Sequence, residues 1–200
     1  HGPDAARSLE SAGGVTPIPE CLLERVEIDH TPVDVIVVDE TNRKPIGRPY
    51  LSVAIDTTSR CIIGFLVSLE APSATSVSLC LPHAVADKDA WLAARGIEGS
   101  WPICGKPLLI YVDNGSEFHS EALRRGCEQH GIELGYRPPG KPNFGGVIER
   151  VIGTFMRKCH ELPGTTFSNT AQRKGYKAEK LACLTLADLE RWMALAIITY

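Results

Sequence analysis

The sequence predicts an α/β fold in which a mixed sheet of five strands is flanked by helices. Short runs of apolar and β-branched residues alternate with segments of helical periodicity, and clusters of turn residues separate them. The apolar fraction of 44% and the charged fraction of 22% are ordinary for a globular protein. A length of 200 residues suits one domain with a full core.

The first three strands are predicted before the first helix. Residues 26–39 form an apolar, β-branched run that Pro32 is expected to interrupt. Residues 50–56 and 61–69 are typical of a hairpin. A helical pattern then extends from Ser73 to about Ala94, and Pro82 predicts a kink or a break within it.

Strands and helices alternate in the next part of the chain. Residues 107–112 form a continuous apolar run of the kind found in buried strands, and residues 132–136 form another short strand. Between them a helix is expected over residues 117–130, with Ser116 as its N-cap and Gly131 directly after its end.

The clearest helix is predicted over residues 147–160, where apolar residues recur every four positions. A basic loop or partly helical insertion follows at about residues 161–184. Thr185 and Asp188 have the spacing of a capping box, which predicts a last helix that continues to Tyr200.

The chain is expected to divide into a lead-in and one domain. Residues 1–20 are rich in Gly, Ala, Ser and Pro without periodicity, and His1-Gly2-Pro3 is typical of a tag remnant. The domain is expected over residues 21–200. Because the apolar helical pattern is still present at Tyr200, we expect this domain to be truncated at its C-terminal end.

Charge is distributed unevenly along the chain. The formal net charge is −3, but residues 1–136 carry 11 Lys and Arg against 19 Asp and Glu, whereas residues 137–200 carry 10 against 5. The basic segment, which starts with Arg137, suits an edge that contacts phosphates beside an acidic site. A solvated charged surface is the alternative interpretation for any one of these residues.

The seven cysteines are scattered, and none belongs to a C-x-x-C pair or to a His/Cys pattern typical of zinc. Reduced core cysteines in a cytosolic protein are therefore expected. No run of about 18 apolar residues is present, so no membrane partner is expected.

Three acidic residues stand in distinctive contexts. Asp29 lies in Val-Glu-Ile-Asp-His-Thr on the first strand, and Asp113 opens Asp-Asn-Gly directly after a buried strand. Glu149 lies in Gly-Val-Ile-Glu-Arg, in the first turn of the clearest helix. The interval between Asp113 and Glu149 is 35 residues.

These residues resemble the catalytic triad of DDE transposases and retroviral-type integrases, and the order of predicted elements resembles the ribonuclease H-like fold. Two segments, Gly145–Phe155 and Gly47–Leu51, look most like the bacteriophage Mu, TniA and TnsB group of bacterial transposases. The resemblance implies a bacterial, cytoplasmic transposase core that nicks transposon 3′ ends and joins them to target DNA. It also implies a homo-oligomer in the active form, with accessory transposition proteins as further partners.

Such chemistry needs an activated nucleophile and charge stabilisation on the attacking and leaving oxygens. Two Mg²⁺ ions, with Mn²⁺ as a substitute, supply both, and Mg²⁺ prefers carboxylate and water oxygens. Asp29, Asp113 and Glu149 are therefore the expected catalytic residues and metal ligands.

Several other residues are weaker candidates for the site. Asp34 and Asp39 are rivals of Asp29, whereas Asp56 matches a structural position of the family and is expected to pair with Arg60. His30 and His119 are more typical of packing or surface positions than of ligands. The candidate DNA contacts are four basic residues near the acids: Lys141, Arg150, Arg157 and Lys158.

Two alternative functions remain open at this point. One is a ribonuclease H-like nuclease that only hydrolyses, although no acidic residue lies between Glu70 and Asp87, where such hydrolases often carry one. The other is a catalytically silent DNA-binding core.

Overall fold

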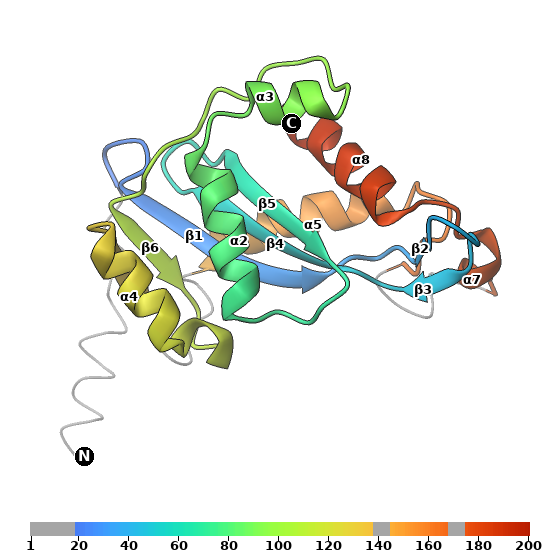
Figure 1. Ribbon diagram of the computed structural model, residues 1–200, viewed down its shortest axis with the longest axis horizontal. Coiled ribbons are helices and arrows are strands. Elements are labelled where there is room, and N and C mark those ends of the chain that lie inside the picture. Colours follow the sequence, from blue (N-terminus) through green and yellow to red (C-terminus); the bar gives the residue numbers. More distant parts are fainter. Residues whose placement is uncertain (1–18, 138–144, 168–174) are drawn as a thin grey trace.

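The computed structural model describes residues 19–137, 145–167 and 175–200, except for the side chains of residues 116 and 117. Its main sheet has five strands in the order β5-β4-β1-β6-β7 (Figure 1). β1 pairs antiparallel with β4 and parallel with β6, so the sheet is mixed. The strands are β1 (Arg25–Pro32), β4 (Tyr50–Asp56), β5 (Ile62–Ser68), β6 (Leu109–Val112) and β7 (Glu133–Tyr136).

Helices cover both faces of this sheet. α2 (Ala74–Val85) and α4 (Glu121–Gln129) lie on the face nearer the viewer in Figure 1, and α5 (Gly146–Cys159) lies behind the strands. α8 (Leu186–Ile198) packs beside α5. The predicted α/β fold with a mixed five-stranded sheet flanked by helices is therefore confirmed.

Short elements connect this framework. They are a two-stranded sheet of β2 (Val37–Val38) and β3 (Pro45–Gly47), the helices α3 (Asp89–Ala94) and α7 (Ala178–Leu181), and the 3-10 helix η1 (Ser116–His119). The expected interruption at Pro32 is correct, because β1 ends there. None of the described helices is long and apolar enough to cross a lipid bilayer.

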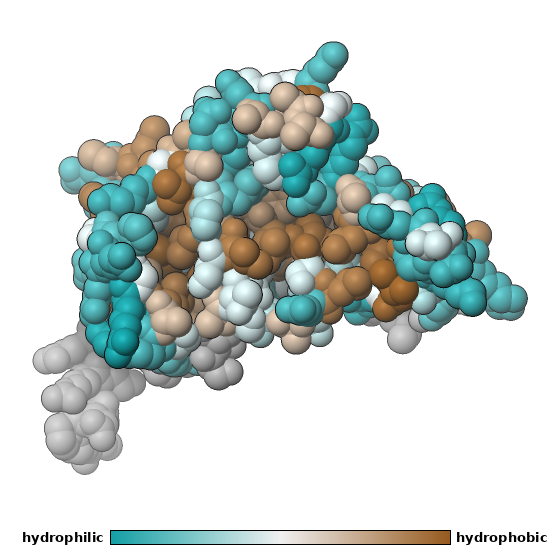
Figure 2. All heavy atoms as spheres, in the orientation of Figure 1, coloured by the Kyte–Doolittle hydropathy of each residue, from teal (hydrophilic) through white to brown (hydrophobic). Residues whose placement is uncertain are grey.

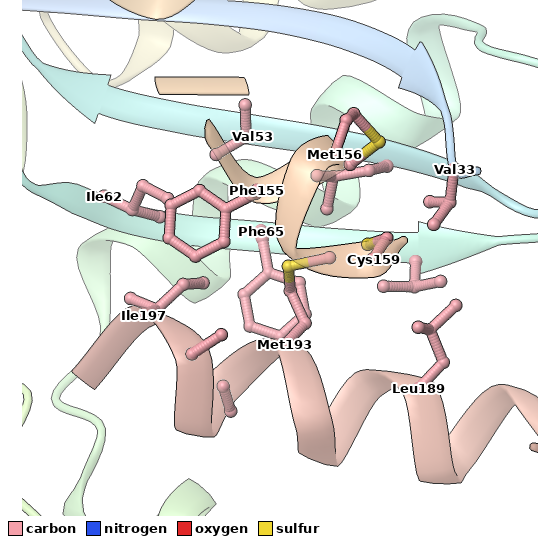
Figure 3. Close-up of a cluster of buried hydrophobic side chains, with 14 of the residues drawn as sticks. Val33, Val53, Ile62, Phe65, Phe155, Met156, Cys159, Leu189, Met193 and Ile197 are labelled. Atoms are coloured by element: carbon pink, nitrogen blue, oxygen red, sulfur yellow. The ribbon is translucent and has the colours of Figure 1, made fainter. Parts of the chain in front are cut away.

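Two buried clusters hold the layers together. One joins α2 and α4 to the near face of the sheet and includes Val26, Ile28 and Val112. The other joins α5 and α8 to the far face; Figure 3 shows Phe155 of α5 and Met193 of α8 within it. Because β1 alternates between the two faces, Glu27 and Asp29 lie on the α5 face.

Three local predictions need correction. The helical segment predicted from Ser73 to about Ala94 is divided, but not at Pro82 itself: α2 continues to Val85, the N–H of Ala86 still donates to the carbonyl of Pro82, and α3 begins at Asp89. Ser116 does not cap the next α-helix, which instead begins after Ser120, whose hydroxyl accepts the N–H of Leu123. Completely buried Phe118 anchors η1 in between, so the α-helix starts four residues later than expected.

The third correction concerns Asp56. Its carboxylate accepts the backbone N–H groups of Leu23 and Ser59, both at distances below 3 Å, and the Ser59 hydroxyl. The structural role is confirmed, but the predicted side-chain pairing is wrong: the two residues meet through the backbone, where the N–H of Arg60 donates to the carbonyl of Asp56 at 2.8 Å, and among the described ion pairs none joins Asp56 to the exposed Arg60 side chain.

Other local predictions are confirmed. Gly131 follows the end of α4 with a positive φ of 63°, and Thr185 and Asp188 form the capping box of α8. The cysteines are free, and Cys80, Cys127 and Cys159 are core residues as expected. Cys21 and Cys183 are exposed, contrary to the expectation. The predicted lead-in lies outside the described residues, apart from Pro19 and Glu20.

Candidate active site

Strand register brings Asp29 and Asp113 to the same level of the sheet. Parallel pairing sets Glu27 of β1 opposite Tyr111 of β6. Two residues further along, the same register carries Asp29 to the level of Asp113, which directly follows β6. Side chains at matched positions of a sheet project to the same face, so both carboxylates belong to the α5 side.

The two carboxylates influence each other electrostatically. Burial raises the pKa of Asp29, and the negative charge of Asp113 raises it further. The backbone N–H of His30, 2.8 Å from Oδ1, and the guanidinium of Arg137 act in the opposite direction. Asp113 is held by a hydrogen bond of 2.8 Å from the backbone N–H of Gly115 to its Oδ1.

Glu149 lies in the first turn of α5, and its side chain is exposed. Its Oε1 lies 3.0 Å from the position that a Cβ would take on Gly145, and the guanidinium of Arg137 borders the same point. Within the described part of the chain, no three His, Cys, Asp or Glu side chains are grouped closely enough to hold a metal ion. The structure thus pairs Asp29 with Asp113 and leaves Glu149 outside a three-acid cluster.

Two further charged residues, Glu27 and Arg137, lie at this site, and no sequence pattern predicted them there. Glu27 is almost fully buried, and burial raises its pKa against the lowering effects of Arg137 and Arg25. The backbone N–H of Ile148, in the first turn of α5, also lowers it, so Glu27 lies at the start of that helix. The two-residue alternation along β1 could have indicated that Glu27 shares the face of Asp29.

The position of Arg137 corrects an expectation. The basic segment that it starts was expected at an exposed, phosphate-contacting edge, but Arg137 is only 8% exposed. Its Nη1 lies 3.4 Å from Oδ2 of Asp29, and its Nη2 lies 3.8 Å from Oε2 of Glu27. Arg137 is therefore part of the acidic site.

The rival aspartates have structural roles. Asp34 pairs with Arg48 at 2.7 Å and lies 3.3 Å from Nε2 of His160. Asp39 organises the turn before β3 by accepting three backbone N–H groups, which hold its pKa below its ordinary value. Neither carboxylate lies on β1 or directly after β6.

Both histidines near the acids have packing roles, as expected. The ring of His30 stacks on Phe118, with 5.1 Å between centroids, and its Nδ1 is 2.7 Å from the hydroxyl of Ser52. The ring of His119 stacks on Tyr136 at 4.5 Å.

The predicted DNA contacts have different environments. Arg150 and Arg157 are exposed on α5, on the same helix as Glu149. Lys158 is half-buried, and its ammonium lies 5.6 Å from the ring centre of Phe155. Lys141 lies outside the described residues.

The face opposite the acids is apolar. Figure 2 shows hydrophobic surface along the middle of the α2 side of the molecule. A cavity of about 400 Å³ lies between α2 and α4, lined by apolar side chains that include Leu81, Leu123 and Ile132. It contains no carboxylate and does not belong to the site of Asp29 and Asp113.

The mixed sheet, with one acid within its central strand β1 and a second directly after the adjacent parallel strand β6, defines a ribonuclease H-like core. A similar fold occurs in the simian T-cell lymphotropic virus intasome bound to the PP2A regulatory subunit B56 gamma, with a TM-score of 0.51 and 18% identity over 75% of this chain and 47% of that chain. The chain belongs to the family described as TnsB C-terminal domain, which matches residues 27–164.

Two curated relatives are consistent with this family. The chain is 32% identical over 144 residues to the transposase for transposon Tn552 of Staphylococcus aureus. It is 34% identical over 136 residues to the transposition protein TnsB of transposon Tn7 from Escherichia coli. These matches cover 72% and 66% of this chain, but only 28% and 19% of the relatives. The chain is therefore a transposase core of the TnsB group that spans about a quarter or less of their length.

Proposed function

We propose that this core catalyses metal-dependent cleavage at transposon 3′ ends and then joins the freed 3′ hydroxyl groups to target DNA by direct transesterification. Asp29, Asp113 and Glu149 are the catalytic residues and the metal ligands in this proposal. The observation that carries it is the pairing of Asp29, within β1, with Asp113, directly after the adjacent parallel strand β6, on the face where the helix of Glu149 begins.

The donor atoms fit Mg²⁺ or Mn²⁺. Asp29 and Asp113 offer hard oxygen ligands on rigid elements, and their mutual repulsion favours a bound cation. When bound, a pair of such ions would activate the attacking water or hydroxyl group and stabilise charge on the leaving oxygen. Glu149, in the first turn of α5, would complete the ligand set by a change of side-chain position.

Neighbouring residues position the acids and contact the DNA in this proposal. The hydrogen bond from His30 orients Asp29, and the hydrogen bond from Gly115 orients Asp113. Arg150 and Arg157, exposed on the helix of Glu149, are suited to contact phosphate oxygens of the DNA. Lys141 and Lys158 are proposed as weaker contributors to the same surface.

The names of the relatives support the proposed partners. Their names describe a transposase and a transposition protein, and the similar viral structure is an intasome. We therefore propose that the longer protein acts on transposon ends and target DNA as a homo-oligomer with accessory proteins in the bacterial cytoplasm. Residues 21–200 would be its integrase-type core, with the region of about 161–184 as a basic insertion.

Strand transfer by the longer parent protein tests the proposal. The assay combines candidate transposon-end DNA, Mg²⁺ and a supercoiled target. Asp113→Asn, and likewise Asp29→Asn or Glu149→Gln, should reduce joined products by at least about 10³-fold, since a metal ligand is lost. Circular dichroism should show a retained fold. Glu121→Gln, an exposed change on the opposite face, is the matched control.

The outcomes separate the competing functions. Efficient joining by Asp113→Asn would refute its catalytic role. Cleavage without joining by the wild-type protein would instead favour the hydrolase, although α2, the first long helix, contains no acidic residue. A protein that binds DNA but neither cleaves nor binds Mn²⁺ would be a silent core.

A further inference from the structure

The backbone of Arg137 is fixed directly beside Asp113. Its N–H donates to the carbonyl of Val112 at 2.8 Å, and its carbonyl accepts from Nδ2 of Asn114 at 2.5 Å. These two partners flank Asp113 in the sequence. The Arg137 side chain therefore starts from a well-anchored position at the end of β6 and extends toward β1.

The guanidinium of Arg137 lies among carboxylates from two elements, β1 and α5. Nη1 is 3.4 Å from Oδ2 of Asp29, and Nη2 is 3.8 Å from Oε2 of Glu27. A Cβ built on Gly145 would lie 2.5 Å from Nη1 and 3.0 Å from Oε1 of Glu149. The guanidinium thus stands between the Asp29 carboxylate and the start of the helix that carries Glu149.

This buried charge is incompletely satisfied by hydrogen bonds. Among the described residues, Nε and Nη2 of Arg137 and Oε2 of Glu27 are buried atoms without a hydrogen-bond partner. A buried guanidinium normally uses its planar donors in paired hydrogen bonds to carboxylates, and unused buried donors are unfavourable. Because its contacts with both carboxylates are long, Arg137 is held by charge attraction more than by hydrogen bonds. A guanidinium held in this way can move away from Asp29.

From this geometry we infer that Arg137 is an internal competitor of the divalent metal for the Asp29 carboxylate, and that Glu27 is the residue that retains its guanidinium when the metal takes Asp29. The inference rests on the proposed metal-binding function. Glu27 suits this role because it lies two residues before Asp29 on the same face of β1 and is already in contact with Nη2. Arg137 would thereby weaken metal binding to the protein.

Metal affinity measured without DNA tests the competition. The 200-residue chain is titrated with Mn²⁺, and free Mn²⁺ is measured by electron paramagnetic resonance. Arg137→Gln should bind Mn²⁺ at least about tenfold more tightly than the wild-type chain, because one charge-assisted contact to Asp29 is removed. Arg150→Gln, which removes an exposed charge from the same site region, should change the affinity less than about twofold.

A double-mutant cycle tests the role of Glu27. If Glu27 retains the displaced guanidinium, Glu27→Gln should weaken Mn²⁺ binding more in the wild-type background than in Arg137→Gln, by at least about threefold. If Arg137→Gln alone fails to fold, the double variant, which removes both buried charges together, is compared with Glu27→Gln, and the competition requires the double variant to bind Mn²⁺ more tightly. Independent effects of the two changes would overturn the assignment of Glu27.

The outcomes distinguish this inference from the proposed function. Equal Mn²⁺ affinity of the wild-type chain and Arg137→Gln, with weakened binding by Asp113→Asn, would overturn the competition and leave the metal site standing. Absence of Mn²⁺ binding by every variant would overturn the metal site and the competition together. Tighter binding by Arg137→Gln but not by Arg150→Gln supports both.

Discussion

Gly145→Ala should destabilise the protein through the guanidinium of Arg137. Gly145 is the N-cap of α5 with a φ of −108°, so alanine fits the backbone. Its Cβ would lie 2.5 Å from Nη1 and 2.9 Å from Cζ of Arg137, whereas ordinary contacts are 3.4–4 Å. The guanidinium, at the end of a flexible side chain, would have to move by about 1 Å within its buried site, so the expected cost lies at the lower end of the range for crowding, about 1–2 kcal/mol.

A neighbouring glycine provides the matched control. A Cβ on Gly146 meets nothing within 4 Å, and Gly146 is the first residue of α5. Gly146→Ala should therefore stabilise the protein by roughly 0.5–1 kcal/mol, the usual advantage of alanine over glycine in a helix. The two variants, one residue apart, are expected to shift the free energy of unfolding in opposite directions.

Urea unfolding in the presence of EDTA measures both shifts. Because alanine is also a poorer N-cap than glycine, Gly145→Ala should retain a loss of about 0.5–1 kcal/mol even when the crowding is relieved. Repeating the change in an Arg137→Ala background isolates the crowding, with an expected coupling of about 1–2 kcal/mol. If Gly145→Ala is equally destabilising in both backgrounds, the contact with Arg137 is not the cause.

Two further predictions concern the hydrophobic core and the pH dependence of stability. Phe155→Ala should lower the free energy of unfolding by about 3–5 kcal/mol, because Phe155 is 1% exposed in the cluster between α5, α8 and the sheet (Figure 3); urea unfolding would reveal a smaller loss if the helices repack. Burial, with Lys88 and Arg95 nearby, lowers the pKa of His83 to about 4 from 6.5. The unfolded chain therefore gains a proton that the folded protein does not, so this contribution to stability is complete above pH 6.5 and is lost as the pH falls toward 4, by about 1–3 kcal/mol. His83→Asn, which can still accept the N–H of Phe65, should lose this part of the pH dependence, and an unchanged profile would contradict the assignment.

Patterns confined to one element could be predicted from the sequence. The helix of Glu149 was evident because its apolar residues repeat every four positions, and the observed α5 differs from the prediction by one residue at each end. The capping box of Thr185 and Asp188 was likewise local. The register that joins Asp29 to the level of Asp113 follows from pairing between strands distant in sequence, so only the resemblance to a known family made it predictable.

Predictions failed where tertiary packing decides between local alternatives. Ser116 and Ser120 are both acceptable N-caps, and complete burial of Phe118 in η1 selects Ser120. Pro82 lacks an N–H donor, which removes one hydrogen bond to the preceding turn, but the turn after it still forms because the N–H of Ala86 donates to the carbonyl of Pro82. The partner of Asp56 was wrong for a similar reason: backbone N–H groups reach its carboxylate, and the exposed Arg60 side chain does not.

The buried pair of Glu27 and Arg137 explains why the site could be recognised from the sequence while its electrostatics could not. Asp29 and Asp113 are marked by their sequence contexts, but Glu27 resembles any polar residue on a half-buried strand. Arg137 belongs to a segment whose net positive charge pointed to a DNA-contacting edge. Its backbone contacts beside Asp113 instead direct the guanidinium inward, where it opposes the rise in pKa that burial causes at both Asp29 and Glu27. A cluster of carboxylates on one sheet face needs a nearby cation to remain ionised in a buried setting. Under the proposed function these carboxylates also bind metal, which requires a cation that can move aside, and Arg137 is placed to do so.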